Sequence, residues 1–514
     1  MLLDEHIARH ASLRPDGEAL TDGACRLSYR ELELLSNRIA RCLRARGIGS
    51  GDLVLVVMKR SVRFLASVIG VMKAGAAYVP LEVRTPAARR SQIIGDCRAR
   101  AVICDAESAA RMAADEDVVR LGATILPADG EEVAAADETA PSRSGSPDDL
   151  ACVLYTSGST GNPKGVMLSH GNIDEYVSWA VDRIGITADD RVLGTAPFYF
   201  DMSLFDVYGS LRAGAPLCIA VERVLLFPKS LIELAVREEV TVWKGISSLL
   251  MYLSTTGALA LDPLPRFRVV LFAGEALATK YLIDWMKTFP DTAFYNAYGP
   301  TEATGVSMYH RLERPPAGAD ERIPIGIPCE NTELLLLDDD RNPVTPGEVG
   351  EIALAGPCIS RGYLNDPEKT ARAFVAHPSR PGARIYLTGD YARRRPDGTH
   401  EFVGRRDNQV KFMGYRIELT DIESALTAIE GVTEAGVVLG RQARAGVAEL
   451  VGYVVLGGEK TVVEVQAELR ATLPFYMLPK HLHGIDQLPR GDRGKLDRRA
   501  LEAYHREREG RAET

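Results

Sequence analysis

The feature that most constrains this chain is a loop rich in glycine and hydroxyl side chains, YTSGSTGNPKG at residues 155–165. The apolar run 151–154 before the loop and the run 166–170 after it are both predicted strands. A loop of this composition can turn backbone N–H groups and hydroxyls toward a polyphosphate, with Lys164 as a point charge on its oxygens. We therefore predict that the phosphates of a nucleotide bind here.

The loop differs from the common phosphate-binding loop, in which Gly-Lys is followed by Ser or Thr at the start of a helix. Here Pro163 precedes Lys164, Gly165 follows it, and the chain returns to a predicted strand. A flexible Ser/Gly hairpin is the alternative interpretation, and the density of the pattern disfavours it. The loop resembles the signature of the adenylate-forming superfamily, which includes acyl-CoA synthetases, luciferases and the adenylation domains of peptide synthetases.

Length and charge restrict the function further. A chain of 514 residues is too long for one core, so we expect two or more domains. Its 61 Lys and Arg stand against 70 Asp and Glu, which gives a formal net charge of −9. An acidic protein creates no overall field that attracts nucleic acid or anionic membranes, so a nucleotide must be held locally.

The cysteines and the first residues indicate a compartment. The eight cysteines are scattered without a C-x-x-C pair, which is typical of reduced core residues. The start of the chain has no basic region followed by an apolar run, and no apolar segment reaches the length that spans a bilayer. We therefore expect a cytoplasmic protein.

Apolar periodicity predicts alternating helices and strands in the first part of the chain. Ser28 can cap a helix in which Glu31 lies three residues later. Residues 53–58 are typical of a buried strand, and a helix is predicted over 62–72. This alternation favours a parallel sheet with crossover helices. Residues 105–148 are rich in Ala and acids and then in Pro, Ser and Gly, so we interpret them as a surface excursion that ends in a linker.

Asp201 is a candidate substrate residue. It lies in the segment PFYFDMSLFD at 197–206, where aromatic neighbours make an unpaired carboxylate costly, so it requires a cationic partner. From the residues alone, a structural salt bridge or a helix cap is the favoured interpretation. The family resemblance implies instead that Asp201 holds the α-ammonium group of an amino acid, as the Asp of the Phe-Asp-x-Ser motif does in amino-acid-activating members.

Two further segments resemble nucleotide-binding blocks of the family. Residues 269–275 form a predicted buried strand that ends at a glycine, and open α/β sheets bind ligands beyond the carboxyl ends of such strands. The second block is NAYGPTE at 296–302, which read alone is only a turn. An aromatic face suits the base, and a carboxylate suits a hard cation. The resemblance assigns adenine stacking, contact with the α-phosphate and binding of Mg²⁺ to Tyr298, Thr301 and Glu302.

The last blocks concern the ribose and the domain boundary. The motif YLTGD ends in Asp390, which the resemblance implies accepts hydrogen bonds from both ribose hydroxyls; an aspartate that caps a buried turn is the alternative. In GRRDNQVK at 404–411, the resemblance places a nucleotide contact on Arg405 and a hinge on Asp407. Only its position in the family pattern distinguishes Lys495 from an ordinary surface lysine.

The resemblance covers residues 27–498 and implies the architecture. We predict an α/β fold with a large multi-layered N-terminal domain (1–406), in which helices flank β-sheets, and a small mobile α+β lid (407–514). The hinge is expected at Asp407. The charged tail from Tyr504 onward is expected to be frayed.

The resemblance also implies a ligase with two half-reactions. The first joins a carboxylate to ATP and releases pyrophosphate, and the second transfers the acyl group to the phosphopantetheine thiol of a separate carrier protein. A carboxylate is already ionised at pH 7, so catalysis rests on positioning and charge neutralisation. Lys495 would bridge the attacking carboxylate and the α-phosphate. The predicted catalytic residues are Thr156, Lys164, Glu302, Asp407 and Lys495.

Two sets of binding residues follow from these blocks, and both rest on the resemblance. The predicted nucleotide set comprises Thr156, Ser157, Gly158, Ser159, Thr160, Gly161, Lys164, Gly274, Glu275, Ala276, Asn296, Ala297, Tyr298, Gly299, Thr301, Asp390, Arg405 and Lys495, with Mg²⁺ on Glu302. The predicted substrate set comprises Asp201, Met202, Phe205, Ser248, Leu271, Ala273, Ala297, Gly305, Val306 and Lys495. Its apolar majority predicts a small to medium, mostly apolar amino acid. The stretches 200–211 and 272–282 resemble those of free-standing prolyl and D-alanyl carrier-protein ligases, which implies a stand-alone amino-acid adenylation domain with a proline- or alanine-like substrate.

Three other functions are weighed against this one. An acyl-CoA synthetase acting on a non-amino acid would leave Asp201 without a cation. A tRNA-synthetase-type enzyme makes the same adenylate, but the chain resembles none of its motifs and has no basic RNA surface. A non-catalytic nucleotide-binding protein on the same scaffold is disfavoured because Lys164, Glu302, Asp390, Asp407 and Lys495 are all present.

Overall fold

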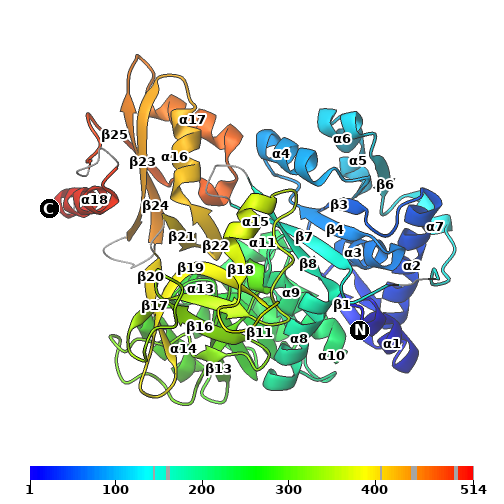
Figure 1. Cartoon of the computed structure of the whole chain (residues 1–514). Helices are drawn as coiled ribbons and strands as arrows, with labels where there is room; N and C mark the ends of the chain where they lie inside the picture. The colour runs from blue at the N-terminus through cyan, green and yellow to red at the C-terminus, as the bar shows by residue number, and fades with distance from the viewer. Residues whose placement is uncertain (143–144, 158–162, 406–407, 442–447, 491–495, 513–514) are drawn as a thin grey trace. The chain divides into compact units, whose positions relative to one another are not determined.

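The computed structural model of the chain describes residues 1–142, 145–157, 163–405, 408–441, 448–490 and 496–512. The protein is a mixed α/β molecule with several sheets, as predicted (Figure 1). The chain divides into two compact units. The first unit consists of Met1–Val83, Ile94–Tyr155 and Gly165–Arg406, and the second of Arg84–Ile93, Thr156–Lys164 and Asp407–Thr514.

A sheet of mainly parallel strands organises the N-terminal part of the first unit. Its strand order is β6 (Thr124–Pro127), β5 (Ala101–Cys104), β3 (Leu53–Val57), β4 (Ala77–Leu81), β7 (Leu150–Thr156) and β8 (Lys164–Ser169). Parallel pairing of β3 with β4 and β5 confirms the predicted crossovers. The associated helices are α1 (Glu5–Leu13), α2 (Tyr29–Ala45), α3 (Val62–Ala74), α4 (Ala87–Cys97), α5 (Ala106–Ala113), α6 (Glu116–Leu121) and α7 (Glu131–Ala135).

The local signals in this part act as predicted. The Ser28 hydroxyl accepts a hydrogen bond from the Glu31 N–H, and the Glu31 carboxylate accepts one from the Ser28 N–H. This capping box starts α2. Helix α3 ends at Gly75, whose φ of 92° is a left-handed conformation that glycine adopts without strain. The two helices pack side by side (Figure 1).

The interpretation of residues 105–148 as a surface excursion is wrong for its first half. Strand β6 pairs in parallel with β5 at the edge of the sheet, and its Leu126 is fully buried. The acid-rich segments before it are the helices α5 and α6, which lead the chain back to this edge. A run of four residues is too short to stand out between such helices, so the strand escaped prediction.

A second sheet carries most of the candidate site residues. Its strand order is β15 (Ile327–Pro328), β14 (Met308–Leu312), β13 (Ala293–Tyr298), β12 (Val269–Ala273), β11 (Val242–Ile246), β9 (Val192–Gly194), β10 (Leu217–Ile219), β1 (Glu18–Thr21) and β2 (Arg26–Ser28). Strands β11, β12 and β13 run parallel, so their carboxyl ends meet at one edge. Strand β12 is fully buried, as predicted.

Helices connect β8 to β9 and then join the successive strands of this second sheet from β9 to β13. They are α8 (His170–Ile184), α9 (Met202–Leu204), α10 (Ser210–Ala213), α11 (Glu222–Leu225), α12 (Pro228–Arg237), α13 (Ser247–Thr255) and α14 (Thr279–Thr288). A π-helical turn, Phe205–Gly209, joins α9 to α10. Such turns occur often at functional sites.

A third, antiparallel sheet completes the first unit. Its strands are β16 (Glu333–Leu337), β17 (Val349–Ala355), β18 (Phe374–Ala376), β19 (Arg384–Arg394) and β20 (His400–Arg405), with α15 (Pro367–Ala373) preceding β18. Strands β19 and β20 pair so that Asp390 lies opposite Arg405. The sheet therefore brings two candidate nucleotide residues together.

The second unit contains a hairpin and a further sheet. The hairpin pairs β21 (Gln409–Phe412) with β22 (Tyr415–Glu418) through Gly414, whose φ is 76°. The sheet has the order β23 (Val432–Arg441), β24 (Ala448–Leu456) and β25 (His481–Gly484), with α16 (Leu419–Thr427), α17 (Val462–Thr472) and α18 (Arg498–Ala512).

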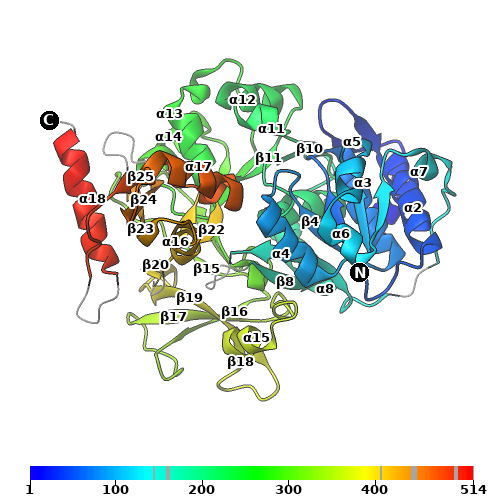
Figure 2. The same cartoon turned by 90° about the horizontal axis from the view of Figure 1, so that it is seen from above.

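The expectation of a frayed tail from Tyr504 is wrong, because α18 continues to Ala512 and lies beside the sheet of the second unit (Figure 2). Its His505 ring is buried, and His505 Nδ1 lies 3.0 Å from the hydroxyl of Tyr453 on β24. Burial of this face of the helix against the sheet outweighs the charge of the tail.

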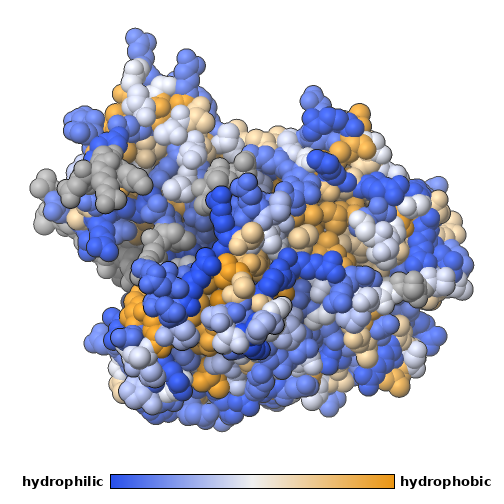
Figure 3. Space-filling model, in the orientation of Figure 1, coloured by the Kyte–Doolittle hydropathy of each residue, from blue (hydrophilic) through white to orange (hydrophobic). Residues whose placement is uncertain are grey.

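Polar side chains cover much of the face of the molecule in Figure 3. Among the described residues, no helix is both long and apolar enough to cross a membrane. The expectation that the cysteines are reduced core residues holds for seven of them, all buried and unpaired, whereas Cys25 is exposed.

Candidate active site

The glycine-rich loop joins two adjacent strands, as predicted. Thr156 is the last residue of β7 and Lys164 is the first of β8. The predicted second strand ends one residue early, because Ser169 caps α8 and His170 is already helical. Ser157 is described, whereas Gly158, Ser159, Thr160 and Gly161 lie outside the described residues, as do Asp407 and Lys495.

The carboxyl ends of β11 and β12 are tied together by Glu275. The Ser247 hydroxyl donates to the Glu275 carbonyl oxygen at 2.7 Å, and the Ser248 N–H donates to Glu275 Oε1 at 3.0 Å. Glu275 therefore satisfies a free N–H at the start of α13. Ser248 Oγ is buried and makes no hydrogen bond to another described residue, so it is available to a polar group of a ligand.

Asp201 and Thr301 link the substrate and nucleotide motifs. The Thr301 hydroxyl donates to Asp201 Oδ2 at 2.7 Å, although the residues are 100 positions apart. Thr301 begins a short 3₁₀ turn after β13, and Asp201 directly precedes α9. The bond orients a carboxylate that is half-buried and able to pair with a cation.

Glu302 is the candidate ligand for Mg²⁺. Its side chain is fully buried, and the Tyr363 hydroxyl donates to its Oε1 at 2.8 Å. Mg²⁺ commonly takes one or two protein carboxylates and completes its shell with phosphate and water oxygens, so a single oriented carboxylate fits the ion. Within the described ranges, no group of three His, Cys, Asp or Glu side chains could hold a metal ion without such additional ligands.

Tyr298, Asp390 and Arg405 form one buried network. The Tyr298 hydroxyl donates to Asp390 Oδ2 at 2.5 Å, and Arg405 Nη1 donates to Asp390 Oδ1 at 2.6 Å. Burial and the neighbouring carboxylate of Asp390 raise the pKa of Tyr298 well above its usual value, so the phenol is a donor at neutral pH. Each carboxylate oxygen accepts two hydrogen bonds, so Asp390 retains capacity for hydroxyl donors of a ligand.

This network should matter for stability. Arg405→Met removes one partner of a carboxylate that is 2% exposed, and we expect it to lower the free energy of unfolding by about 3 kcal/mol. The matched control is Arg322→Met, because Arg322 is 78% exposed and pairs with Glu401 at 2.9 Å. We expect that control to cost less than about 1 kcal/mol. Urea unfolding of both variants measures the difference, and equal losses would contradict the assignment.

The remaining candidate residues surround the same strand ends. Gly299 has no room for a side chain, since a Cβ there would lie 1.9 Å from the Gly305 carbonyl oxygen. Gly274 directly follows β12 and has φ 91°. The Asn296 side chain donates to the Pro324 carbonyl oxygen at 2.8 Å, and Ala276 is exposed. Buried apolar members of the substrate set are Met202, Phe205, Leu271, Ala273, Ala297 and Val306.

Sequence reasoning missed Lys244 and Asp206. Lys244 is 1% exposed on β11, and Asp206 is fully buried on the π-helical turn next to Phe205. Burial raises the pKa of Asp206 to about 7, against the opposing effect of the Lys244 ammonium. The available signal was a single lysine inside the apolar run VTVWKGI, because a buried charge requires a specific reason.

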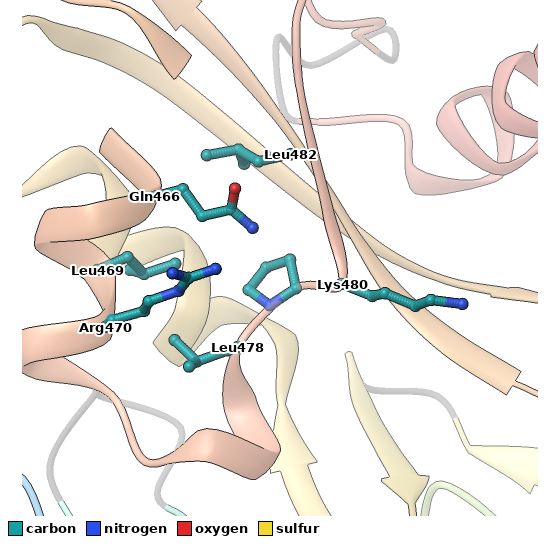
Figure 4. Close-up of a pocket in the computed structure, with 7 residues that line it drawn as sticks. Gln466, Leu469, Arg470, Leu478, Lys480 and Leu482 are labelled. Carbon is teal, nitrogen blue, oxygen red and sulfur yellow. The ribbon is translucent and has the colours of Figure 1, made fainter. Parts of the chain in front are cut away.

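A pocket of about 170 Å³ lies in the second unit. The side chains of Gln466, Leu469 and Arg470 on α17 face the segment that leads into β25 (Figure 4). Leu478, Pro479, Lys480 and Leu482 complete its lining, and none of these residues belongs to the predicted sets.

Comparison with known proteins explains the convergence of these motifs. The model of the AMP-binding enzyme family matches residues 7–364, and that of the AMP-binding enzyme C-terminal domain matches residues 421–495. The chain belongs to the AMP-binding enzyme family. It is an adenylate-forming ligase that uses ATP, with homologues among nonribosomal peptide synthetases (NRPS), as the sequence resemblance predicted.

Three similar proteins illustrate the relationship. Bacitracin synthase 3 of Bacillus licheniformis is 34% identical over 97% of this chain, and the match spans 8% of that synthase. Zwittermicin A synthase ZmaJ of Bacillus cereus is 33% identical over 97% of this chain and 94% of its own length. The solved structure of holo-PA1221, an NRPS protein containing adenylation and PCP domains bound to a vinylsulfonamide inhibitor, has a TM-score of 0.83 at 25% identity, covering 97% of this chain and 84% of that one.

Proposed function

We propose that this AMP-binding enzyme activates a small to medium, mostly apolar amino acid, proline- or alanine-like in size, as the aminoacyl adenylate. It then transfers the aminoacyl group to the phosphopantetheine thiol of a carrier protein. The observation that carries the proposal is the 2.7 Å bond from Thr301 to Asp201, because it joins a carboxylate suited to an ammonium group to the motif proposed for the α-phosphate. Peptide synthetases among the relatives support an amino acid as the substrate, and the PCP domain of holo-PA1221 supports a carrier as the acceptor.

Each proposed residue acts by position or charge. Asp201 binds the α-ammonium group and thereby directs the carboxylate of the amino acid toward Thr301. Lys164 and Lys495 offset negative charge at the phosphates, where the attacking carboxylate would otherwise be repelled. Tyr298 and Asp390 hold the adenosine, and Glu302 would hold Mg²⁺, which supplies further charge neutralisation at the phosphates. The attacking group is an ionised carboxylate, so no general base is required.

Amino-acid-dependent exchange of labelled pyrophosphate into ATP tests this function. The panel contains alanine and proline in both enantiomers, larger apolar amino acids, and the corresponding acids without an amine. We expect exchange with amino acids alone, because Asp201 stabilises only an ammonium group. Exchange that depends on a non-amino acid would instead favour an acyl-CoA synthetase.

Glu302→Gln separates the metal site from the amino-acid site. The substitution keeps the size of the side chain and a hydrogen-bond acceptor for Tyr363 but removes the charge that attracts a hard cation. We expect the rate of pyrophosphate exchange to fall about 100-fold or more, with a smaller change in the KM of the amino acid. Titration of Mg²⁺ measures the effect, and equal changes in both quantities would argue against Glu302 as the metal ligand.

A further inference from the structure

The two ends of the glycine-rich loop lie against each other. The first residue of the loop, Tyr155, belongs to β7, and the last, Gly165, belongs to β8. A Cβ added at Gly165 would lie 3.0 Å from Cζ of the Tyr155 ring and 2.7 Å from Cγ1 of Val153, so only glycine leaves room for the ring. Tyr155 and Gly165 are both buried. The Tyr155 side chain therefore spans the base of the loop.

Asp96 holds the Tyr155 ring at its hydroxyl end. The hydroxyl donates to Oδ2 of Asp96, in the last turn of α4, at 2.6 Å. Burial raises the pKa of Tyr155, and Cys97 and Asp96 add to this shift, so the phenol is a donor at neutral pH. A hydrogen bond to a carboxylate is stronger than one between neutral groups. The bond thus fixes the orientation of the ring over Gly165.

The segment 361–365 connects Asp96 to the other end of the loop. Its Leu364 N–H donates to the Gly165 carbonyl oxygen at 2.8 Å. The Asn365 side chain donates to the Asp96 carbonyl oxygen at 2.8 Å and to Asp96 Oδ1 at 3.4 Å. Asn365 has φ 51°, a left-handed conformation that asparagine adopts more readily than most residues. A closed ring of contacts therefore runs from one end of the loop through Asp96 and this segment to the other end.

The ring of contacts should matter more for the loop than for the stability of the fold. Asn365 is exposed and Asp96 is half-buried, so their hydrogen bonds compete with water and add little to the free energy of unfolding. Three of the eleven residues of the loop are glycines, which lose the most conformational freedom when they are ordered. Fixed ends restrict that freedom before a ligand binds, which lowers the entropy cost of binding.

We infer that Asp96, which belongs to none of the predicted sets, is a positioning residue for the phosphates of ATP. Acting through Tyr155 and Asn365, it keeps the two ends of the glycine-rich loop at a fixed spacing. The inference rests on the proposed binding of the phosphates to this loop. Because AMP lacks the β- and γ-phosphates, the effect of Asp96 should be confined to ATP. Tyr298 and Asp390 are proposed to hold the adenosine of both nucleotides.

The dissociation constants of ATP and AMP, measured by titration calorimetry in the presence of Mg²⁺, test the inference. Tyr155→Phe removes only the hydroxyl donor, and Asp96→Ala removes the acceptor. We expect each variant to bind ATP about 10-fold more weakly, as the loss of one hydrogen bond to a carboxylate implies, and to change the affinity for AMP less than about 2-fold. In pyrophosphate exchange, the KM of ATP should rise by a similar factor while the KM of the amino acid stays unchanged.

Two further variants separate positioning from a general loss of structure. Asp96→Asn keeps an oxygen that accepts from the Tyr155 hydroxyl, so it should retain the wild-type affinity for ATP within about 3-fold. Tyr309→Phe is the matched control, because Tyr309 is buried in the same unit and its hydroxyl donates to Glu330 Oε1 at 3.3 Å. We expect this control to leave the affinities for both nucleotides unchanged.

The contrary outcomes are equally specific. An unchanged affinity for ATP in both Tyr155→Phe and Asp96→Ala overturns the inference, and so do parallel losses of affinity for ATP and AMP. Pyrophosphate exchange that no amino acid supports in the wild-type protein overturns the proposed function instead. The two failures are distinct, because the nucleotide affinities are measured without an amino acid.

Discussion

Replacing Asp201 by alanine is expected to abolish most amino-acid-dependent pyrophosphate exchange. The ammonium group of a bound amino acid would lose its carboxylate partner in a largely desolvated site, which costs about 3–5 kcal/mol or two to three orders of magnitude in kcat/KM. Exchange assays on the wild-type protein and the variant measure the loss. The affinity for ATP should change less, because Tyr298 and Asp390 are proposed to hold the adenosine, whereas Asp201 accepts its hydrogen bond from Thr301.

Two variants show whether the negative charge of Asp201 is what supports amino-acid-dependent pyrophosphate exchange. Asp201→Asn keeps an oxygen that can accept from Thr301 but removes the charge, so we expect a loss close to that of Asp201→Ala. Thr301→Val removes the donor and keeps the carboxylate, so we expect a smaller loss in amino-acid binding. Protection against heat by ATP, which follows from mass action, verifies that the variants are folded. If Asp201→Ala activates its amino acid as well as the wild-type protein does, Asp201 is structural and the amino-acid proposal fails with it.

The sequence predicted those elements whose signals are local. The capping box of α2 and the apolar run of β12 each depend on adjacent residues, and both form as expected. The short β6 was missed because its four residues gain their stability from pairing with β5, and each paired residue lies 23 positions earlier in the chain. The same reason explains the tail, where burial of His505 against β24 stabilises a helix that its charge pattern does not favour.

The candidate site shows the same division. Motif resemblance named Asp201, Thr301, Glu302, Tyr298 and Asp390, but it could not give the bonds that connect them. The Thr301–Asp201 and Tyr363–Glu302 pairs depend on how three sheet regions fold together. Lys244 belongs to no motif, and only its register with Leu271 and its contacts with Tyr176 and Met202 reveal its place.

The two half-reactions should depend on different residues of the second unit. Lys495 is proposed to neutralise charge during adenylation, so Lys495→Ala should lower pyrophosphate exchange by about 100- to 1,000-fold. We further propose that Gly414, in the tight turn between β21 and β22 at φ 76°, lines the path of the thiol arm. A bulky Gly414→Leu should therefore spare exchange and impair transfer of the aminoacyl group to a holo-carrier protein, because a side chain fills space that bare backbone leaves open.

Separate assays of the two steps on each variant decide whether the division exists. Lys495→Ala should still transfer a supplied aminoacyl adenylate to the carrier, since that step occurs after the phosphates have left. The matched control for Gly414→Leu is Gly431→Leu, which introduces the same side chain at a similar φ of 89° in the same unit. The control accounts for backbone strain at a positive φ, so only a loss of transfer specific to Gly414→Leu supports the thiol path. If Lys495→Ala and Gly414→Leu reduce both steps in parallel, one arrangement of the second unit serves both reactions, and the proposed swing about Asp407 has no role in the cycle.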